Sequence, residues 1–288
     1  MSLNRLPLLV SLAVLLPFSN AQAQAYERQR VQPNGPSLCL GSRTFTYALA
    51  TTAGRPMAAE RAAVVAAFNA WSEAASTCSD LVFKQAADVP NGTQPPYDGK
   101  TLVTFRKVKC ADVVPSSDAC LNNSTCGDKY DCWEHPPSNV VQALVTYEVA
   151  TGLIAGTNIE LNASLGTLTT VDSPPCPQGV VQPGCVAGDV QSLVTRSIGE
   201  ALGLALVSRA DSTLSSTLPW GDTQKRVIDP GTLQGLCELY PRGKPTPDCA
   251  LPEPETPGDD DGCSAASSTP LLGALVLLLG IWRRRMPC

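Results

Sequence analysis

Cysteine content limits the fold of this chain more than any other feature, with twelve cysteines in 288 residues. The N-terminus indicates export. Arg5 and an apolar run over residues 6–18 precede the small-residue pattern Ala21-Gln22-Ala23, as in a secretory signal peptide. We therefore expect residues 1–25 to be a signal peptide, and the cysteines of the exported chain to be paired as disulfides.

Ten of the cysteines lie between residues 39 and 249, an even number that permits five bridges. They are Cys39, Cys78, Cys110, Cys120, Cys126, Cys132, Cys176, Cys185, Cys237 and Cys249. Close spacing favours locally stapled loops, but a sequence does not determine disulfide connectivity. A zinc site at Cys126 and Cys132 is the alternative, which their five-residue gap and the lack of a second tight pair disfavour.

Composition indicates one folded domain. The hydrophobic content of 43% is enough for a packed core, and a net charge of −5 without a basic stripe argues against nucleic acid as a partner. Residues 244–262 are rich in Pro, Glu, Asp and Gly, which is typical of a solvated linker. We expect the folded domain over residues 26–243 and a separate C-terminal segment over residues 263–288.

Hydrophobic periodicity predicts the main elements of that domain. Residues 43–49 alternate between apolar and polar, which predicts a half-buried strand. Residues 57–76 place apolar side chains at helical spacing on one face, namely Val64, Phe68, Trp71 and Ala75. Further strands are expected over residues 101–108, 143–149 and 157–162, with a cysteine-rich insertion over residues 110–137.

A second helix is expected over residues 190–202. Asp189 is a suitable N-cap for this helix, and Gly203 can adopt the left-handed conformation that a sharp helix exit requires.

The order of these segments from residue 45 to residue 241 resembles the matrixin branch of the metzincin metalloproteases. The segments that carry the resemblance are FTYAL, AAFNAWSE, ALVTYEVATGLIAGTNIELN, DVQSLVTRSIGEALGLAL and GLCELYP, which span about two thirds of the chain. The resemblance implies an α+β fold with a twisted mixed sheet, a backing helix over residues 57–76, an active-site helix over residues 190–202 and a mostly irregular C-terminal lobe.

The active helix of that family reads H-E-x-x-H-x-x-G-x-x-H, in which three histidines bind zinc and the glutamate activates the zinc-bound water. Aligned residue by residue, the motif falls on Arg196, Ser197, Glu200, Gly203 and Leu206. Only the glycine matches. The family's methionine turn corresponds to SSTLP, which puts Leu218 at the methionine position.

The zinc chemistry of the family therefore lacks its ligands. The single histidine, His135, lies in the cysteine-rich insertion, whereas a catalytic zinc needs about three protein ligands. We expect no zinc and no other cofactor. Arg196 and Glu200 are at i, i+4, so they either form an ion pair where zinc would lie or remain solvated in an open cleft. A Ser-His-Asp triad would also require His135, and no G-x-S-x-G motif occurs.

The C-terminus carries a second resemblance. Residues 264–282 are apolar and uncharged, long enough to span about 30 Å of hydrocarbon. The arginines Arg283, Arg284 and Arg285 follow at once and would stay on the cytoplasmic side. With Cys263 directly before the span, the pattern resembles the myxobacterial C-terminal sorting signal, which implies processing or lipid attachment at Cys263 by a myxosortase-type enzyme. An ordinary tail-anchored helix is the alternative.

Together these features predict a surface-anchored, matrixin-like pseudoprotease. The expected role is noncatalytic binding of a peptide or protein ligand in the former substrate cleft, at the outer membrane surface after sorting. The alternatives are an active metalloendopeptidase with a noncanonical site and a structural or adhesive surface protein. The combination of domain and tail resembles the myxosortase-dependent metalloprotease family, from which this chain departs at the zinc site.

Overall fold

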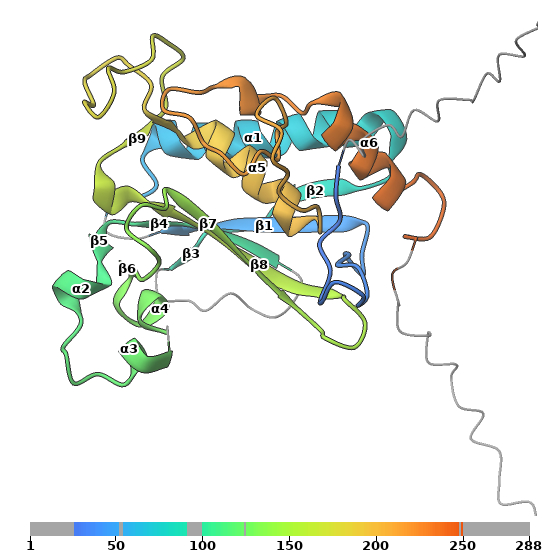
Figure 1. Ribbon diagram of the computed structural model, residues 1–288, viewed down its shortest axis with the longest axis horizontal. Coiled ribbons are helices and arrows are strands. Elements are labelled where there is room, and N and C mark those ends of the chain that lie inside the picture. Colours follow the sequence, from blue (N-terminus) through green and yellow to red (C-terminus); the bar gives the residue numbers. More distant parts are fainter. Residues whose placement is uncertain (1–25, 52–53, 91–99, 124, 248, 250–288) are drawn as a thin grey trace, which may run out of the picture. The chain divides into compact units, whose positions relative to one another are not determined.

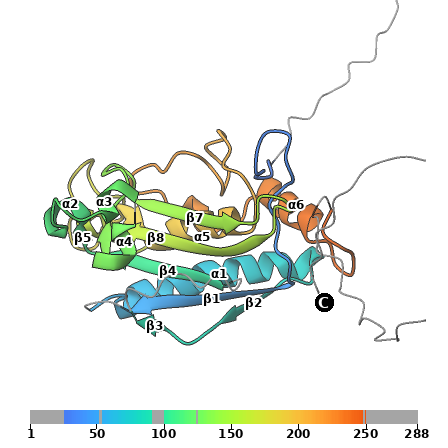
Figure 2. The same cartoon turned by 90° about the horizontal axis from the view of Figure 1, so that it is seen from below.

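The central element is a six-stranded mixed sheet. In the computed structural model, the described residues are 26–51, 54–90, 100–123, 125–247 and 249. The strand order is β2-β1-β4-β8-β7, with β3 paired beside β2 on β1. Only β7 runs antiparallel to its neighbour, and β7 forms one edge of the sheet (Figure 2). The sheet strands are β1 (Thr44–Thr51), β2 (Val82–Gln85), β3 (Val89–Pro90), β4 (Lys100–Arg106), β7 (Val141–Tyr147) and β8 (Ile154–Asn162).

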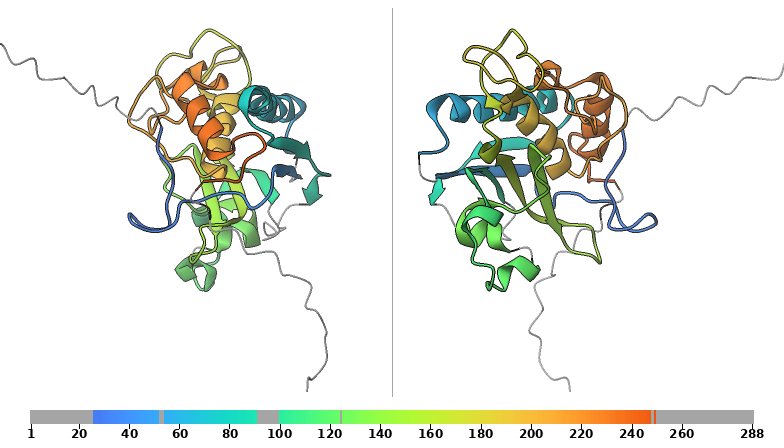
Figure 3. Two further views of the ribbon diagram at one scale, coloured as in Figure 1. Left: turned by 90° about the vertical axis from the view of Figure 1, so that its right-hand side faces the viewer. Right: turned by 60° about the vertical axis from the view of Figure 1, so that its left-hand side comes forward.

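Helices cover one face of this sheet, and the cysteine-rich insertion lies on the other (Figures 1 and 3). The covering helices are α1 (Ala58–Cys78), α5 (Val190–Ala201) and α6 (Pro230–Leu239). The insertion contains β5 (Val108–Lys109), α2 (Cys110–Val113), α3 (Cys120–Asn123), α4 (Cys126–Tyr130) and β6 (Cys132–Trp133). Shorter pieces follow, namely η1 (Ala163–Leu165), β9 (Leu168–Thr169), β10 (Gly188–Asp189) and η2 (Gln224–Arg226).

Strand periodicity explains this division. Val103, Phe105, Ile159 and Leu161 are fully buried in the main core beneath the helices. The residues between them point to the opposite face, because successive side chains of a strand alternate. Thr104 and Arg106 of β4 and Asn158 and Glu160 of β8 occupy such alternate positions, which leaves a polar surface for the insertion to cover.

The backing helix matches the sequence prediction closely. Val64, Phe68, Trp71 and Ala75 of α1 are all buried, and the Trp71 indole donates a hydrogen bond to the Thr195 carbonyl at 2.7 Å. This bond joins α1 to α5 in the core. The ring of Phe68 also stacks on Tyr47 of β1, with 3.6 Å between centroids.

Helix α5 begins and ends as its sequence predicts. The Asp189 carboxylate accepts a hydrogen bond from the Ser192 N–H at 2.8 Å, which caps the first turn. Gly203 has φ +88°, and a Cβ on it would lie 2.4 Å from the Leu38 carbonyl oxygen. Both the backbone conformation and the close approach therefore require glycine.

The ten cysteines among the described residues form five disulfides, as their even number predicted. Three bridges are local, Cys110–Cys132, Cys120–Cys126 and Cys176–Cys185. The other two join distant segments, Cys39–Cys249 and Cys78–Cys237. The latter ties the end of α1 to α6.

The described residues after α5 are mostly irregular, as expected, apart from the short η2 and the ten-residue helix α6, which was not predicted. No helix among the described residues is long and apolar enough to cross a membrane. The predicted span, together with Cys263 and the three arginines, lies outside the described residues, as do the signal peptide and most of the linker.

Candidate functional site

The degenerate zinc positions converge on one cleft between α5 and β7. Its volume is about 450 Å³. One wall is formed by residues 138–143, which enter and begin β7, and the other by α5 and the loops after it. The second wall consists of Arg196, Glu200, Leu206, Ser216 and Leu218. We call this the α5–β7 cleft.

Arg196 and Glu200 form an ion pair at the cleft, which decides between the two arrangements left open by the sequence. Arg196 Nη1 lies 3.7 Å from Glu200 Oε2, and the two side chains are only 8% and 14% exposed. Arg196 Nε also donates to the Ser215 carbonyl at 2.9 Å, which fixes the guanidinium against the loop that precedes Leu218. The pair is therefore mostly buried rather than solvated.

Burial shifts the pKa of each partner in the direction that favours its uncharged form. Burial raises the pKa of Glu200, and the charge of Arg196 opposes that shift only in part. Burial likewise lowers the pKa of Arg196, with partial opposition from Glu200. In addition, Glu200 Oε2 accepts no hydrogen bond from the described residues. A charge-assisted bond would be about 2.7–2.9 Å long, so this pair is loosely joined.

The remaining aligned positions differ in where they lie. Gly203 turns the chain directly after α5, as predicted. Leu206 and Leu218 line the cleft and make its second wall partly apolar, as expected. Ser197, at the position of the catalytic glutamate, is fully buried and is not part of the cleft wall. Its hydroxyl has no hydrogen-bond partner in the part of the chain that the structure describes.

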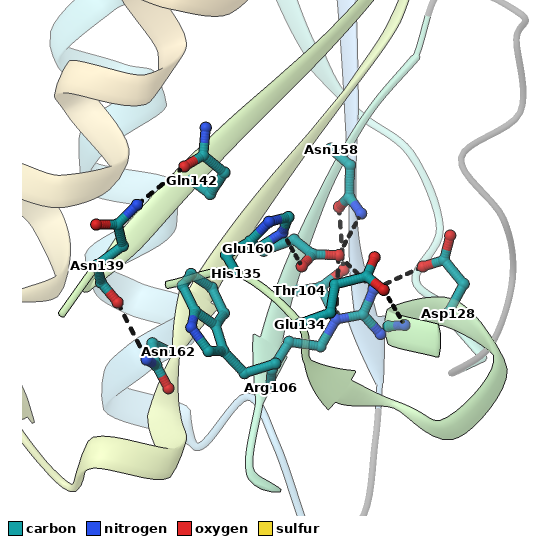
Figure 4. A network of polar contacts seen from close by, with 12 residues as sticks. Thr104, Arg106, Asp128, Glu134, His135, Asn139, Gln142, Asn158, Glu160 and Asn162 are labelled. Carbon is teal, nitrogen blue, oxygen red and sulfur yellow. Dashed lines mark hydrogen bonds and ion pairs between the residues drawn. The ribbon is translucent and has the colours of Figure 1, made fainter. Parts of the chain in front are cut away.

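The β7 wall of the cleft was not identified from the sequence. Asn139 Nδ2 donates to Gln142 Oε1 at 3.3 Å, and Gln142 Nε2 donates to the Ala143 carbonyl at 3.4 Å. Asn162 of β8 holds this segment by donating from Nδ2 to the Asn139 carbonyl at 3.0 Å (Figure 4). The expected strand started at residue 143, two residues later than β7, and so included only Ala143 of the residues that form this wall.

A second polar cluster lies on the opposite face of the sheet, under the insertion. Figure 4 shows Arg106, His135 and Asn158 converging on the carboxylate of Glu160. Arg106 Nη2 also lies 2.6 Å from Asp128, and Arg106 Nη1 lies 3.2 Å from Asp131. Arg106 and Glu160 are both at least 98% buried.

Charge compensation explains how Glu160 stays ionised there. Burial alone would raise its pKa, but the hydrogen bond from His135 and the charge of Arg106 outweigh burial, so the pKa is lowered. His135 Nε2 is 3.1 Å from Glu160 Oε2. His135 therefore does not join the aligned zinc positions, which lie on the helix-covered side. Within the described ranges, no three His, Cys, Asp or Glu side chains are grouped to hold a metal ion.

No protein-family model matches the chain, and no curated protein matches it.

Proposed function

We propose that this protein is a noncatalytic, matrixin-like binding module that holds an extended peptide in the α5–β7 cleft. The observation that carries the proposal is that the edge strand β7 borders a cleft of about 450 Å³. An edge strand with free backbone groups is a template for an added peptide strand.

The edge of β7 is suited to such pairing. Among the described residues, β8 is the only strand that pairs with β7. The Asn162 N–H donates to the Val140 carbonyl at 2.9 Å, so Val140 belongs to the set bonded to β8. Because antiparallel pairs alternate, Val141 and Ala143 direct their backbone groups toward the free edge. A bound peptide would replace the long Gln142 contact to the Ala143 carbonyl.

The side chains of the opposite wall support binding rather than hydrolysis. A guanidinium occupies the position of the family's first zinc ligand, and a positive charge there repels a metal cation. The general-base position holds Ser197, which is buried away from the cleft. Glu200 and Ser216 supply polar groups, while Leu206 and Leu218 supply apolar contact for peptide side chains.

The test is peptide binding with a strand-edge variant. Ala143→Pro removes an N–H that faces the free edge, a position where edge strands tolerate proline. We expect wild type to select peptides from a library and Ala143→Pro to lose them while keeping its melting temperature within a few degrees. Leu144→Thr, on the exposed opposite face, is the matched control and should bind normally.

Two results would contradict this proposal. Chelator-sensitive cleavage of casein with about one zinc per chain would favour the active metalloendopeptidase. A wild-type protein that selects no peptide would favour the structural or adhesive role. Purified protein for these assays should extend through Cys249, because a chain that ends at residue 243, the expected end of the folded domain, would leave Cys39 without its disulfide partner.

We also propose that the protein is exported and displayed at the cell surface, anchored through its C-terminal segment. The support is the order of Cys263, an apolar span and three arginines in the sequence. Cys263→Ala should leave a longer, unprocessed form in the inner membrane, detected by immunoblotting of membrane fractions. A variant of unchanged size at the surface would instead favour a simple tail anchor.

A further inference from the structure

A second cavity, separate from the α5–β7 cleft, lies within the insertion. Its volume is about 270 Å³, close to the lower end of small-molecule sites. Most of its wall is apolar and comes from Ala111, Leu121, Trp133, Pro137 and the Cys120–Cys126 disulfide. Lys109, Glu134 and His135 add the charged or polar groups. We call it the insertion cavity.

His135 presents a hydrogen-bond acceptor to this cavity. The Glu160 carboxylate is ionised and can only accept, so the proton of a neutral imidazole must be on Nε2, 3.1 Å away. The other ring nitrogen, Nδ1, therefore keeps its lone pair. Within the described part of the chain, Nδ1 has no partner, and the side chain is 16% exposed at the cavity wall.

The other two polar residues differ in what they can offer. Glu134 Oε2 already accepts from the backbone N–H groups of Cys126 and Gly127, at 2.8 and 3.0 Å. Lys109 is exposed and forms no ion pair among the described residues, so its ammonium is available as a donor. The cavity thus offers one acceptor and one donor beside apolar walls.

These groups match a hydroxyl on a flat apolar body. A hydroxyl donates one hydrogen bond and accepts another, whereas an ether only accepts. An organic carboxylate fits less well, because the carboxylate of Glu134 lines the cavity and that of Glu160 lies behind His135. A neutral ligand avoids that repulsion.

We propose that the insertion cavity binds a phenol. Its ring packs against the apolar walls, and its hydroxyl donates to His135 Nδ1 and accepts from Lys109 Nζ. The proposal does not depend on peptide binding in the α5–β7 cleft. The same chemistry belongs to a free phenolic molecule and to a tyrosine side chain of another protein, so the test includes both.

The experiment compares matched ligand pairs on the full folded chain. Phenol and anisole differ in whether the oxygen can donate, and N-acetyltyrosinamide and N-acetylphenylalaninamide differ by the hydroxyl alone. Ligand-observed NMR gives affinities, and Trp133 fluorescence, with Trp133→Phe as reference, reports occupancy of the cavity. We expect phenol to bind about tenfold more tightly than anisole, since anisole leaves His135 Nδ1 unpaired.

Variants separate the hydroxyl contacts from the packing. Lys109→Met lies at an exposed position, so it should keep the fold. It should lower the affinity for both phenol and anisole several-fold, because the oxygen of either ligand can accept from the Lys109 ammonium. Glu160→Gln offers an amide that can donate to Nε2, which would move the imidazole proton to Nδ1. If this variant unfolds at the same temperature as wild type, its preference should shift toward anisole.

The outcomes decide between the sources and against the proposal. A tyrosinamide preference over phenylalaninamide indicates a protein ligand, and a preference confined to phenol indicates a small molecule. Equal affinity for phenol and anisole in wild type, or no saturation by either pair at about 10 mM, overturns the proposal. Phenol affinity that is unchanged in Lys109→Met also overturns it.

Discussion

A single arginine holds three carboxylates together beneath the insertion, and its loss tests how the insertion docks. Arg106→Met leaves Glu160 buried without its main counterion, which should cost roughly 3–5 kcal/mol of unfolding free energy. Urea unfolding measures this cost. In the double variant Arg106→Met/Glu160→Gln no carboxylate is left uncompensated at residue 160, so much of the stability should return. A double variant as unstable as the single one would contradict this account.

The same pair predicts a pH dependence. A carboxyl group with a lowered pKa contributes stability above its unfolded pKa, and that contribution is lost as pH falls through the folded pKa. Wild type should therefore lose unfolding free energy on acidification below about pH 4. Arg106→Met should lose less or gain, because its Glu160 prefers to be protonated. If the unfolding free energies of the two proteins changed with pH in parallel, the attribution of this pH dependence to Glu160 would be wrong.

The aligned positions of α5 were predictable because a helix has a fixed period. Residues four apart lie on one face, so the sequence alone placed Arg196 and Glu200 together. It could not decide whether the pair is buried, since that depends on the loop at Ser215. Glu160 and His135 belong to a strand and a distant insertion, and no local rule joins them. The available signal for Glu160 was a charged residue between Ile159 and Leu161, two apolar residues of a predicted strand.

The alignment itself predicts a gain of zinc binding. Arg196, Glu200 and Leu206 all line the α5–β7 cleft, so replacing the three by histidine should create a three-ligand site. Metal analysis of the folded triple variant should find about one zinc per chain. The double variant Arg196→His/Glu200→His, which keeps Leu206, is the control and should bind zinc more weakly. A folded triple variant without zinc would show that the matrixin-like alignment is mistaken.

At the scale of elements, α6 shows what sequence patterns can hide. The segment Pro230–Leu239 was not predicted as a helix, and it contains two glycines, which lower helix propensity. A start signal was nevertheless present, with Asp229 as N-cap and Pro230 at the first position. The predicted strands were found with ends shifted by a few residues, because pairing rather than propensity sets where a strand stops.

Asp229 is the residue on which α6 depends, and its removal should be costly. Its carboxylate accepts from the N–H groups of Gly231 and Thr213 at 2.9 and 2.8 Å, and from the Ser212 hydroxyl at 3.1 Å. Asp229→Ala removes the cap and leaves these donors without an acceptor, so we expect the unfolding free energy to fall by roughly 2–4 kcal/mol. Thermal and urea unfolding measure it. Asp211→Ala, at an exposed position nearby, should have little effect.

Asp229 also has a defined pH signature. Burial raises its pKa, but hydrogen bonds from Thr232, Thr213 and neighbouring backbone outweigh burial, so its pKa is lowered. Its contribution is therefore present above the ordinary aspartate pKa and lost as pH falls below it. The stability difference between wild type and Asp229→Ala should shrink in acid. A difference that is constant from neutral pH to about pH 3 would contradict this.

For the whole molecule, the number of disulfides was predictable but their connectivity was not. Local spacing favoured short loops, and three of the five bridges are indeed local. The Cys39–Cys249 and Cys78–Cys237 bridges join parts that only the complete fold brings together. The position of the insertion likewise depends on the complete fold. Its cysteines indicated a stapled loop, but its docking on Arg106 and Glu160 depends on the whole sheet.

The long and short bridges should differ in their contribution to stability. A cross-link lowers the entropy of the unfolded chain, and the effect is larger for a longer loop. At 25 °C this corresponds to a stabilisation of about 5 kcal/mol for the separation of 159 residues at Cys78–Cys237. For the separation of 6 residues at Cys120–Cys126 it corresponds to about 2 kcal/mol. Cys78→Ala/Cys237→Ala should therefore lower the unfolding free energy more than Cys120→Ala/Cys126→Ala, measured in urea under non-reducing conditions. Cys120 and Cys126 are the more buried pair, so lost packing acts against this order. An equal or reversed order would show that packing in the insertion, rather than closure of the chain, dominates the effect of the bridges.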